Sequence, residues 1–235
     1  MTGLRAGELR KLLLDSLKQP MADLGLTKRA EGAFTYEANP EVLAACQILV
    51  AFHNRVEAGV GVAVGLRHQV VERLVAECAE KPFRRYDLGS PTFNLEVLRQ
   101  AGEKHNELWE INIVDLTSVD RVIHDAILPM VRDGFVPWAD GFQTVEAVRD
   151  RMLPAATEFT GLQSVVEPLS VAQWMLGDPD AAEALLVAYL GMVKEGARYF
   201  YNYEGMLAAF TTFADNLRAR MDAGPYEPPA KSGKP

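Results

Sequence analysis

The sequence of 235 residues has few cysteines, no long apolar run and no strong catalytic motif. Its two cysteines, Cys46 and Cys78, are too few for a disulfide framework and suit a reducing compartment. The chain holds no run of about 18 apolar residues, which a membrane-spanning helix needs. Charged residues interrupt positions 1–19, so these positions lack the apolar core of a signal peptide. We therefore expect a cytoplasmic protein.

The motifs of several enzyme classes are absent as well. No serine lies in a Gly-x-Ser-x-Gly turn, and no cysteine has an obvious histidine base. The glycines Gly59, Gly61 and Gly65 are spaced one residue too widely for a dinucleotide loop, and they lie within an expected strand. We expect no cofactor. The sequence leaves enzymatic activity open and favours a protein that is not an enzyme.

The pair His124-Asp125, with His105 upstream, has the residue types of metal-dependent phosphohydrolases. The pair lies in an expected helix, on the polar face that also carries Asp120 and Arg121. A solvated charged face is the more ordinary explanation of such a group. We therefore expect no metal site.

The charge balance is acidic, with 24 lysines and arginines against 32 aspartates and glutamates, a net charge of −8 and an isoelectric point near 5.1. This balance disfavours binding to nucleic acid and to anionic membranes, because both present negative charge. It favours a basic partner if the partner is charged at all. The sequence does not fix the oligomeric state.

Hydrophobic periodicity changes along the chain from strand to helix. The first 115 residues predict a helix, a three-stranded antiparallel meander, a second helix and a fourth strand. These elements are expected at residues 4–24, 34–37, 46–55, 59–66, 69–80 and 108–114, with one helical turn at Asn39-Pro40-Glu41. In the strand at 59–66, glycines and one alanine form one face and Val60, Val62 and Val64 the other. We expect the helix at 69–80 to cover the glycine face.

From Thr117 onward the period is helical. We expect a helix that stops at Gly134 with a bend at Pro129, and further helices at 144–153, 169–176, 179–194 and 203–221. The fold class is therefore α+β: an N-terminal helix and a four-stranded, mainly antiparallel sheet, followed by a helical half. We divide the chain into a sheet-containing part at 1–115, a helical part at 116–222 and a disordered tail at 223–235.

The residues Gly25-Leu26-Thr27-Lys28-Arg29, followed by Phe34, resemble a motif of uncharacterised bacterial α+β domains. Those domains open with a helix, a Gly-x-x-Lys-Arg turn and an antiparallel meander, and the likeness covers about the first 135 residues. Leu26 stands where an aromatic residue is more usual. The group has no established chemistry, so the resemblance implies a fold and no activity.

Two groups of residues are candidates for an interface with another protein. Glu110 and Asn112 form the polar face of the expected strand at 108–114. The second group is a dense run of arginine and tyrosine at Arg198, Tyr199, Tyr201 and Tyr203. Consecutive helical positions point in different directions, so these rings cannot all enter one core, and tyrosine and arginine are enriched in binding hot spots. Aromatic packing at a helix junction is the alternative.

Four further residues could form an anion site. His53, Arg55, Arg67 and His68 lie at the ends of two strands joined by a short hairpin, and a helix begins just after them. Polar residues also mark ordinary strand ends. The leading hypothesis is a non-enzymatic cytosolic protein that binds another protein, an acidic immunity or antitoxin-like inhibitor of a basic effector. The alternative is a small-molecule-binding protein or an unrecognised enzyme that uses this anion site.

Overall fold

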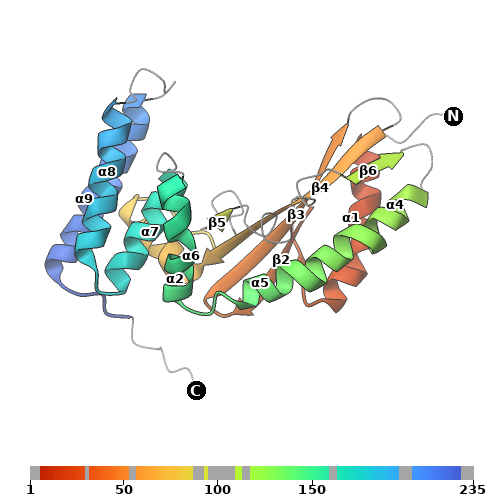
Figure 1. The fold of residues 1–235 in the computed structure, drawn as a ribbon, viewed down its shortest axis with the longest axis horizontal. Helices are drawn as coiled ribbons and strands as arrows, with labels where there is room; N and C mark the ends of the chain where they lie inside the picture. The colour runs from red at the N-terminus through yellow and green to blue at the C-terminus, as the bar shows by residue number, and fades with distance from the viewer. Residues whose placement is uncertain are drawn as a thin grey trace. The chain divides into compact units, whose positions relative to one another are not determined.

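A computed structural model describes residues 6–29, 32–52, 57–86, 93–94, 109–112, 117–158, 163–195 and 203–228. The fold is α+β, as predicted: an N-terminal helix and a mainly antiparallel sheet come first, and the second half is helical (Figure 1). The helices are α1 (Ala6–Asp23), α2 (Gln69–Cys78), α4 (Thr117–Val122), α5 (Val136–Asp140), α6 (Val145–Glu158), α7 (Gln163–Met175), α8 (Pro179–Glu195) and α9 (Tyr203–Ala223). The strands are β1 (Thr27–Lys28), β2 (Ala33–Asn39), β3 (Val42–Phe52), β4 (Glu57–His68), β5 (Phe93–Asn94) and β6 (Trp109–Asn112).

The chain forms two compact units, and each unit draws on segments from both sides of the predicted boundary at residue 115. The first unit comprises residues 1–67 and 93–143, and the second comprises residues 68–92 and 144–235. Each unit has its own cluster of buried apolar side chains, and no residue belongs to both clusters.

The first unit is a sheet covered by helices. Its strands follow the order β1-β2-β3-β4-β5, and β6 also pairs with β4. The pairs β1–β2, β2–β3, β4–β5 and β4–β6 are antiparallel. The core joins the buried stripe of α1 to the valine face of β4 and to the helical segment from α4 to α5. The stripe consists of Leu9, Leu13, Leu17 and Met21, none of which is exposed. Pro20 lies inside α1, and the helix continues through it to Asp23.

The turn between β2 and β3 differs from the prediction. We expected one helical turn at Asn39-Pro40-Glu41, but these residues form the tight turn of a hairpin. The Asn39 Oδ1 accepts hydrogen bonds from the backbone N–H groups of Glu41, at 2.8 Å, and Val42, at 2.9 Å. An asparagine side chain can accept backbone hydrogen bonds both in a tight turn and at the start of a helix. The sequence alone does not distinguish these two structures.

The helical segment that follows β6 runs past its predicted stop. Gly134 lies inside it, and the helix ends only at Asp140. Two π-helical stretches, η3 (Ile123–Ile127) and η4 (Met130–Phe135), lie on either side of Leu128-Pro129. Proline lacks an N–H and crowds the carbonyl four residues before it, and wider turns accommodate that interruption without ending the helix. Glycine alone therefore did not stop the helix.

The second unit is built from α2 and α6 to α9. The apolar stripe of α2, which includes Val71, Leu74 and Cys78, joins the core formed with α7, α8 and α9. Our expectation that this stripe covers the glycine face of β4 was therefore wrong. The helix is amphipathic as predicted, but periodicity identifies only the apolar face of a helix and does not identify the surface on which that face packs.

Candidate functional site

The structure describes three of the six predicted interface residues. Glu110 and Asn112 lie in β6, where their backbones pair with Gly59 and Glu57 of β4. Tyr203 begins α9 and packs, half-buried, against the core of the second unit. The other three, Arg198, Tyr199 and Tyr201, lie outside the described residues. The two predicted groups belong to different units, and their joint role as an interface stays a prediction.

The alternative anion site is described only in part. His53 and Arg55 lie outside the described residues. Arg67 and His68 end β4, and both are buried, with 5% and 1% of their surfaces exposed. The structure therefore leaves the convergence of the four predicted side chains as a prediction.

The outer surface of α8 is apolar in the middle of the helix. Ala184, Val187, Ala188 and Gly191 are all exposed, and their spacing places them on one face of the helix. Val187 is 55% exposed, the highest fraction of any large hydrophobic side chain in the described ranges. The opposite face, with Leu186, Tyr189 and Val193, is buried in the core. A helix that is apolar on both faces was visible in the sequence, and it is the signal that could have identified this surface.

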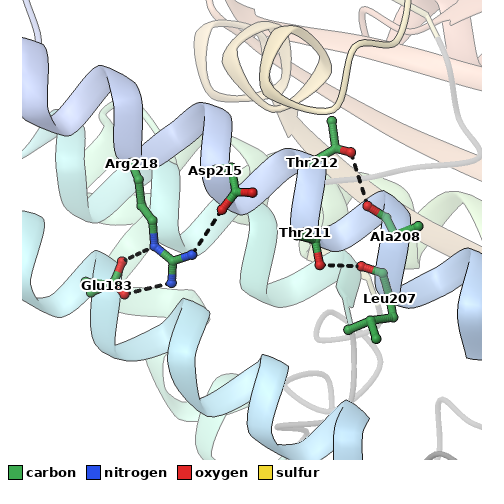
Figure 2. Close-up of polar contacts among 7 residues, drawn as sticks. All are labelled: Glu183, Leu207, Ala208, Thr211, Thr212, Asp215 and Arg218. Atoms are coloured by element: carbon green, nitrogen blue, oxygen red, sulfur yellow. Dashed lines mark hydrogen bonds and ion pairs between the residues drawn. The ribbon is translucent and has the colours of Figure 1, made fainter.

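The helices α8 and α9 also carry carboxylates, some of which bind arginines. Arg218 donates two hydrogen bonds to the Glu183 carboxylate, at 2.8 and 2.7 Å, and one to Asp215 at 3.3 Å (Figure 2). The Arg218 guanidinium thereby lowers the pKa of Glu183. Arg220 forms an ion pair with Glu77 of α2 at 2.9 Å. Two of the three cations of the helices α8 and α9 are thus already bound to carboxylates.

The remaining acids of the hairpin are exposed and form no ion pair with any residue that the structure describes. They are Asp180, Glu195, Glu204 and Asp222. Lys194 is the one other cation of the two helices. The helices α8 and α9 therefore carry more acids than cations, and α8 exposes an apolar face.

The second unit also holds a groove of about 660 Å³. The residues Val70, Arg73, Leu74 and Glu77 of α2 line it, and so does Trp174 of α7. The end of α9 and the segment 223–227 that follows it line the groove as well. The Trp174 indole N–H donates to the Gly224 carbonyl at 3.3 Å, and its ring lies edge-on to the Tyr226 ring at 5.5 Å. This first part of the predicted tail is therefore folded onto the second unit, and residues 229–235 lie outside the described residues.

Sequence analysis did not identify this groove. The apolar residues Val70 and Leu74 were visible as part of an amphipathic helix, and no role was predicted for the residues beside them. The contact between Trp174 and the segment after α9 joins residues 50 positions apart. No local pattern in the sequence indicates such a contact.

The two buried thiols are not activated for nucleophilic chemistry. Burial raises the pKa of the Cys46 thiol to about 12 and that of the Cys78 thiol to about 11. Both thiols therefore stay protonated near neutral pH, whereas the thiolate is the reactive form. Within the described ranges, no three histidine, cysteine, aspartate or glutamate side chains come together as metal ligands would. No helix in these ranges has the length and apolarity needed to cross a membrane.

Comparisons with protein-family models, with curated proteins and with solved structures find no match for this chain. The resemblance of residues 25–34 to uncharacterised bacterial domains therefore remains a prediction.

Proposed function

We propose that this protein acts by binding a basic partner protein through the exposed face of α8. The observation that carries the proposal is the exposed apolar group of Ala184, Val187, Ala188 and Gly191, on a helix that together with α9 carries more acids than cations. Small side chains let a partner helix approach closely, and Val187 provides apolar area at the centre of the face. The partner class that fits this charge is a basic effector that the chain inhibits, as immunity proteins and antitoxins do.

Charge complementarity supports the choice of a basic partner. The net charge of the chain is −8, and Asp180, Glu195, Glu204 and Asp222 lie on the same two helices as the apolar face. Carboxylates around an apolar centre accelerate association with a positively charged surface and reject a negatively charged one. We therefore expect binding to weaken as salt is added.

Crosslinking from the surface itself tests this proposal. A photoreactive amino acid at position 187 is used to capture the partner in cells of the native source, and the partner is then purified and titrated against the intact chain. We expect a basic protein whose affinity falls at least about tenfold with Val187→Glu, since the charge is placed in the apolar contact. The matched control is Leu49→Glu on β3, where the parent side chain is 45% exposed, and it should bind like the parent.

Two results would contradict the proposal. One is a purified partner that binds Val187→Glu as tightly as it binds the parent chain. The other is an affinity that does not change with salt concentration, since an acidic border that contributes to binding must be screened by ions.

A further inference from the structure

The exposed face of α8 has a pattern that complements itself. We infer that this face pairs with the same face of a second copy of the chain, with the two α8 helices antiparallel and a twofold axis between Val187 and Ala188. The pairing concerns the chain alone. Only its consequence rests on the proposed function: a second copy and the basic partner compete for one face.

The first feature that carries this inference is Gly191, whose missing side chain the single chain does not need. Gly191 is exposed inside α8, and a Cβ at this position would meet no atom within 4 Å outside its own turn of the helix. Glycine destabilises a helix interior relative to alanine. A position without a side chain lets the backbone of another helix come close. A helix packed across Gly191 therefore accounts for a glycine that the single chain leaves unused.

The second feature is the order of larger and smaller side chains along the face. In the antiparallel arrangement, Val187 lies level with Ala188 of the second copy, and Ala184 lies level with Gly191 of the second copy. Each larger side chain thus meets a smaller one, so the two faces interdigitate at close range. Val187 is 55% exposed in the single chain, and covering it next to the axis removes apolar area from water.

The third feature is a pair of opposite charges at the two ends of the face. Asp180 lies seven residues before Val187 and Lys194 seven residues after it, so the three share one side of the helix. Neither Asp180 nor Lys194 forms an ion pair with any residue that the structure describes. An antiparallel second helix brings Asp180 of each copy next to Lys194 of the other. A parallel one would bring like charges together, so the charges select the antiparallel direction.

Two negative contributions limit the strength of this pairing without preventing it. Glu195 is exposed next to Lys194, but successive helical residues differ by about 100°, which places Glu195 on the opposite border of the face from Lys194. The net charge of −8 on each copy opposes association at long range, and physiological salt screens that repulsion. We therefore expect a weak, reversible dimer that leaves free chain for the basic partner.

Sedimentation equilibrium of the purified intact chain, from about 5 µM to 1 mM, tests the pairing without any partner protein. We expect a reversible monomer–dimer equilibrium. Gly191→Leu should weaken it at least about tenfold, because the added side chain blocks the close approach of the second helix, whereas the single chain has room for it. Asp125→Lys in the first unit serves as the control for changes of net charge and should dimerise like the parent.

Charge reversal tests the antiparallel direction. Asp180→Lys places two lysines at each end of the dimer, and Lys194→Asp places two aspartates there, so each variant alone should dimerise at least about tenfold more weakly than the parent. An equimolar mixture of the two variants restores an opposite pair at both ends. It should therefore form a heterodimer about as tightly as the parent forms its dimer, which also shows that both variants are folded.

Several outcomes overturn the pairing. They are a parent chain that stays monomeric at 1 mM, a dimer that Gly191→Leu leaves unchanged, and charge-reversed variants that dimerise like the parent or do not pair when mixed. These measurements use no partner, so their failure is separate from a failure of the proposed function. A captured partner that binds the dimer as tightly as the monomer overturns only the competition between the two.

Discussion

Glu167 is a buried carboxylate in α7, with 8% of its surface exposed. It accepts a hydrogen bond from Gln163 Nε2 at 2.6 Å, and burial raises its pKa above the ordinary value of 4.5. An acid whose pKa is raised by folding favours the unfolded chain once it ionises. Stability should therefore fall as the pH rises from the ordinary pKa through the folded-state pKa, and it should be fully restored below both.

We expect Glu167→Gln to be more stable than the parent chain near pH 8 and equally stable near pH 4. The glutamine Oε1 can keep the hydrogen bond from Gln163, and the ionised form is removed. Each unit by which folding raises the pKa is worth about 1.4 kcal/mol. Urea unfolding at the two pH values measures the difference.

The matched control for this prediction is Glu195→Gln on α8, where the carboxylate is exposed and the substitution should have little effect at either pH. The prediction would be contradicted by a Glu167→Gln variant that is less stable than the parent near pH 8. The ionised carboxylate would then stabilise the fold by more than its burial destabilises it.

At the scale of elements, Arg218 joins two helices of the second unit. It binds Glu183 of α8 through two nitrogens and Asp215 of its own helix through a third (Figure 2). The side chains of Arg218 and Glu183 are 32% and 40% exposed, so water and salt screen the pair. Because Arg218 binds the Glu183 carboxylate through two hydrogen bonds, we expect a coupling energy of about 1 kcal/mol, near the upper end of the values for exposed ion pairs.

A double-mutant cycle with Glu183→Gln and Arg218→Met measures this coupling. Because Arg218 lowers the pKa of Glu183, the stabilisation should be present above the ordinary pKa of 4.5 and lost as the pH falls through the folded-state value. We expect it to shrink at high salt as well. A coupling that is the same in acid and at neutral pH would mean that the two helices are held by packing of the aliphatic stems rather than by the ion pair.

The sequence predicted most elements of this fold because their periodicity is local. The stripe Leu9, Leu13 and Leu17 indicated α1, and the alternation of valine and glycine indicated β4. The errors concern residues whose effect depends on their surroundings. Pro129 and Gly134 did not end the helix, because wider turns and continued packing against the core compensated for them.

The candidate sites were harder to predict than the fold. Val187 lies in a helix that is apolar on both faces, and the sequence alone does not say which face the protein core covers. The groove depends on Trp174 meeting Tyr226, a contact between distant positions. Sequence patterns report the neighbours of a residue along the chain, whereas both surfaces are set by packing between elements.

At the scale of the whole molecule, each unit has one cysteine in its own core. Cys46 lies in β3 of the first unit, Cys78 lies in α2 of the second, and neither is exposed. Burial raises the pKa of both thiols well above neutrality, so a thiol reagent can label them only when the surrounding core opens. The two cysteines therefore report separately on the opening of the two units.

We expect substitutions in one core to expose only the cysteine of that core. Phe210 is fully buried in the second unit, 4.3 Å from the Tyr189 ring, and Phe210→Ala should destabilise that unit by about 3–5 kcal/mol. Labelling of Cys78 should then accelerate while that of Cys46 stays unchanged. Phe135→Ala in the first unit should have the reverse effect, because Phe135 belongs to the other cluster. Mass spectrometry of the labelled peptides measures both rates in one sample. If either substitution accelerates labelling at both cysteines equally, the two cores open as one cooperative unit, since separate cores require that a cavity in one leaves the other closed.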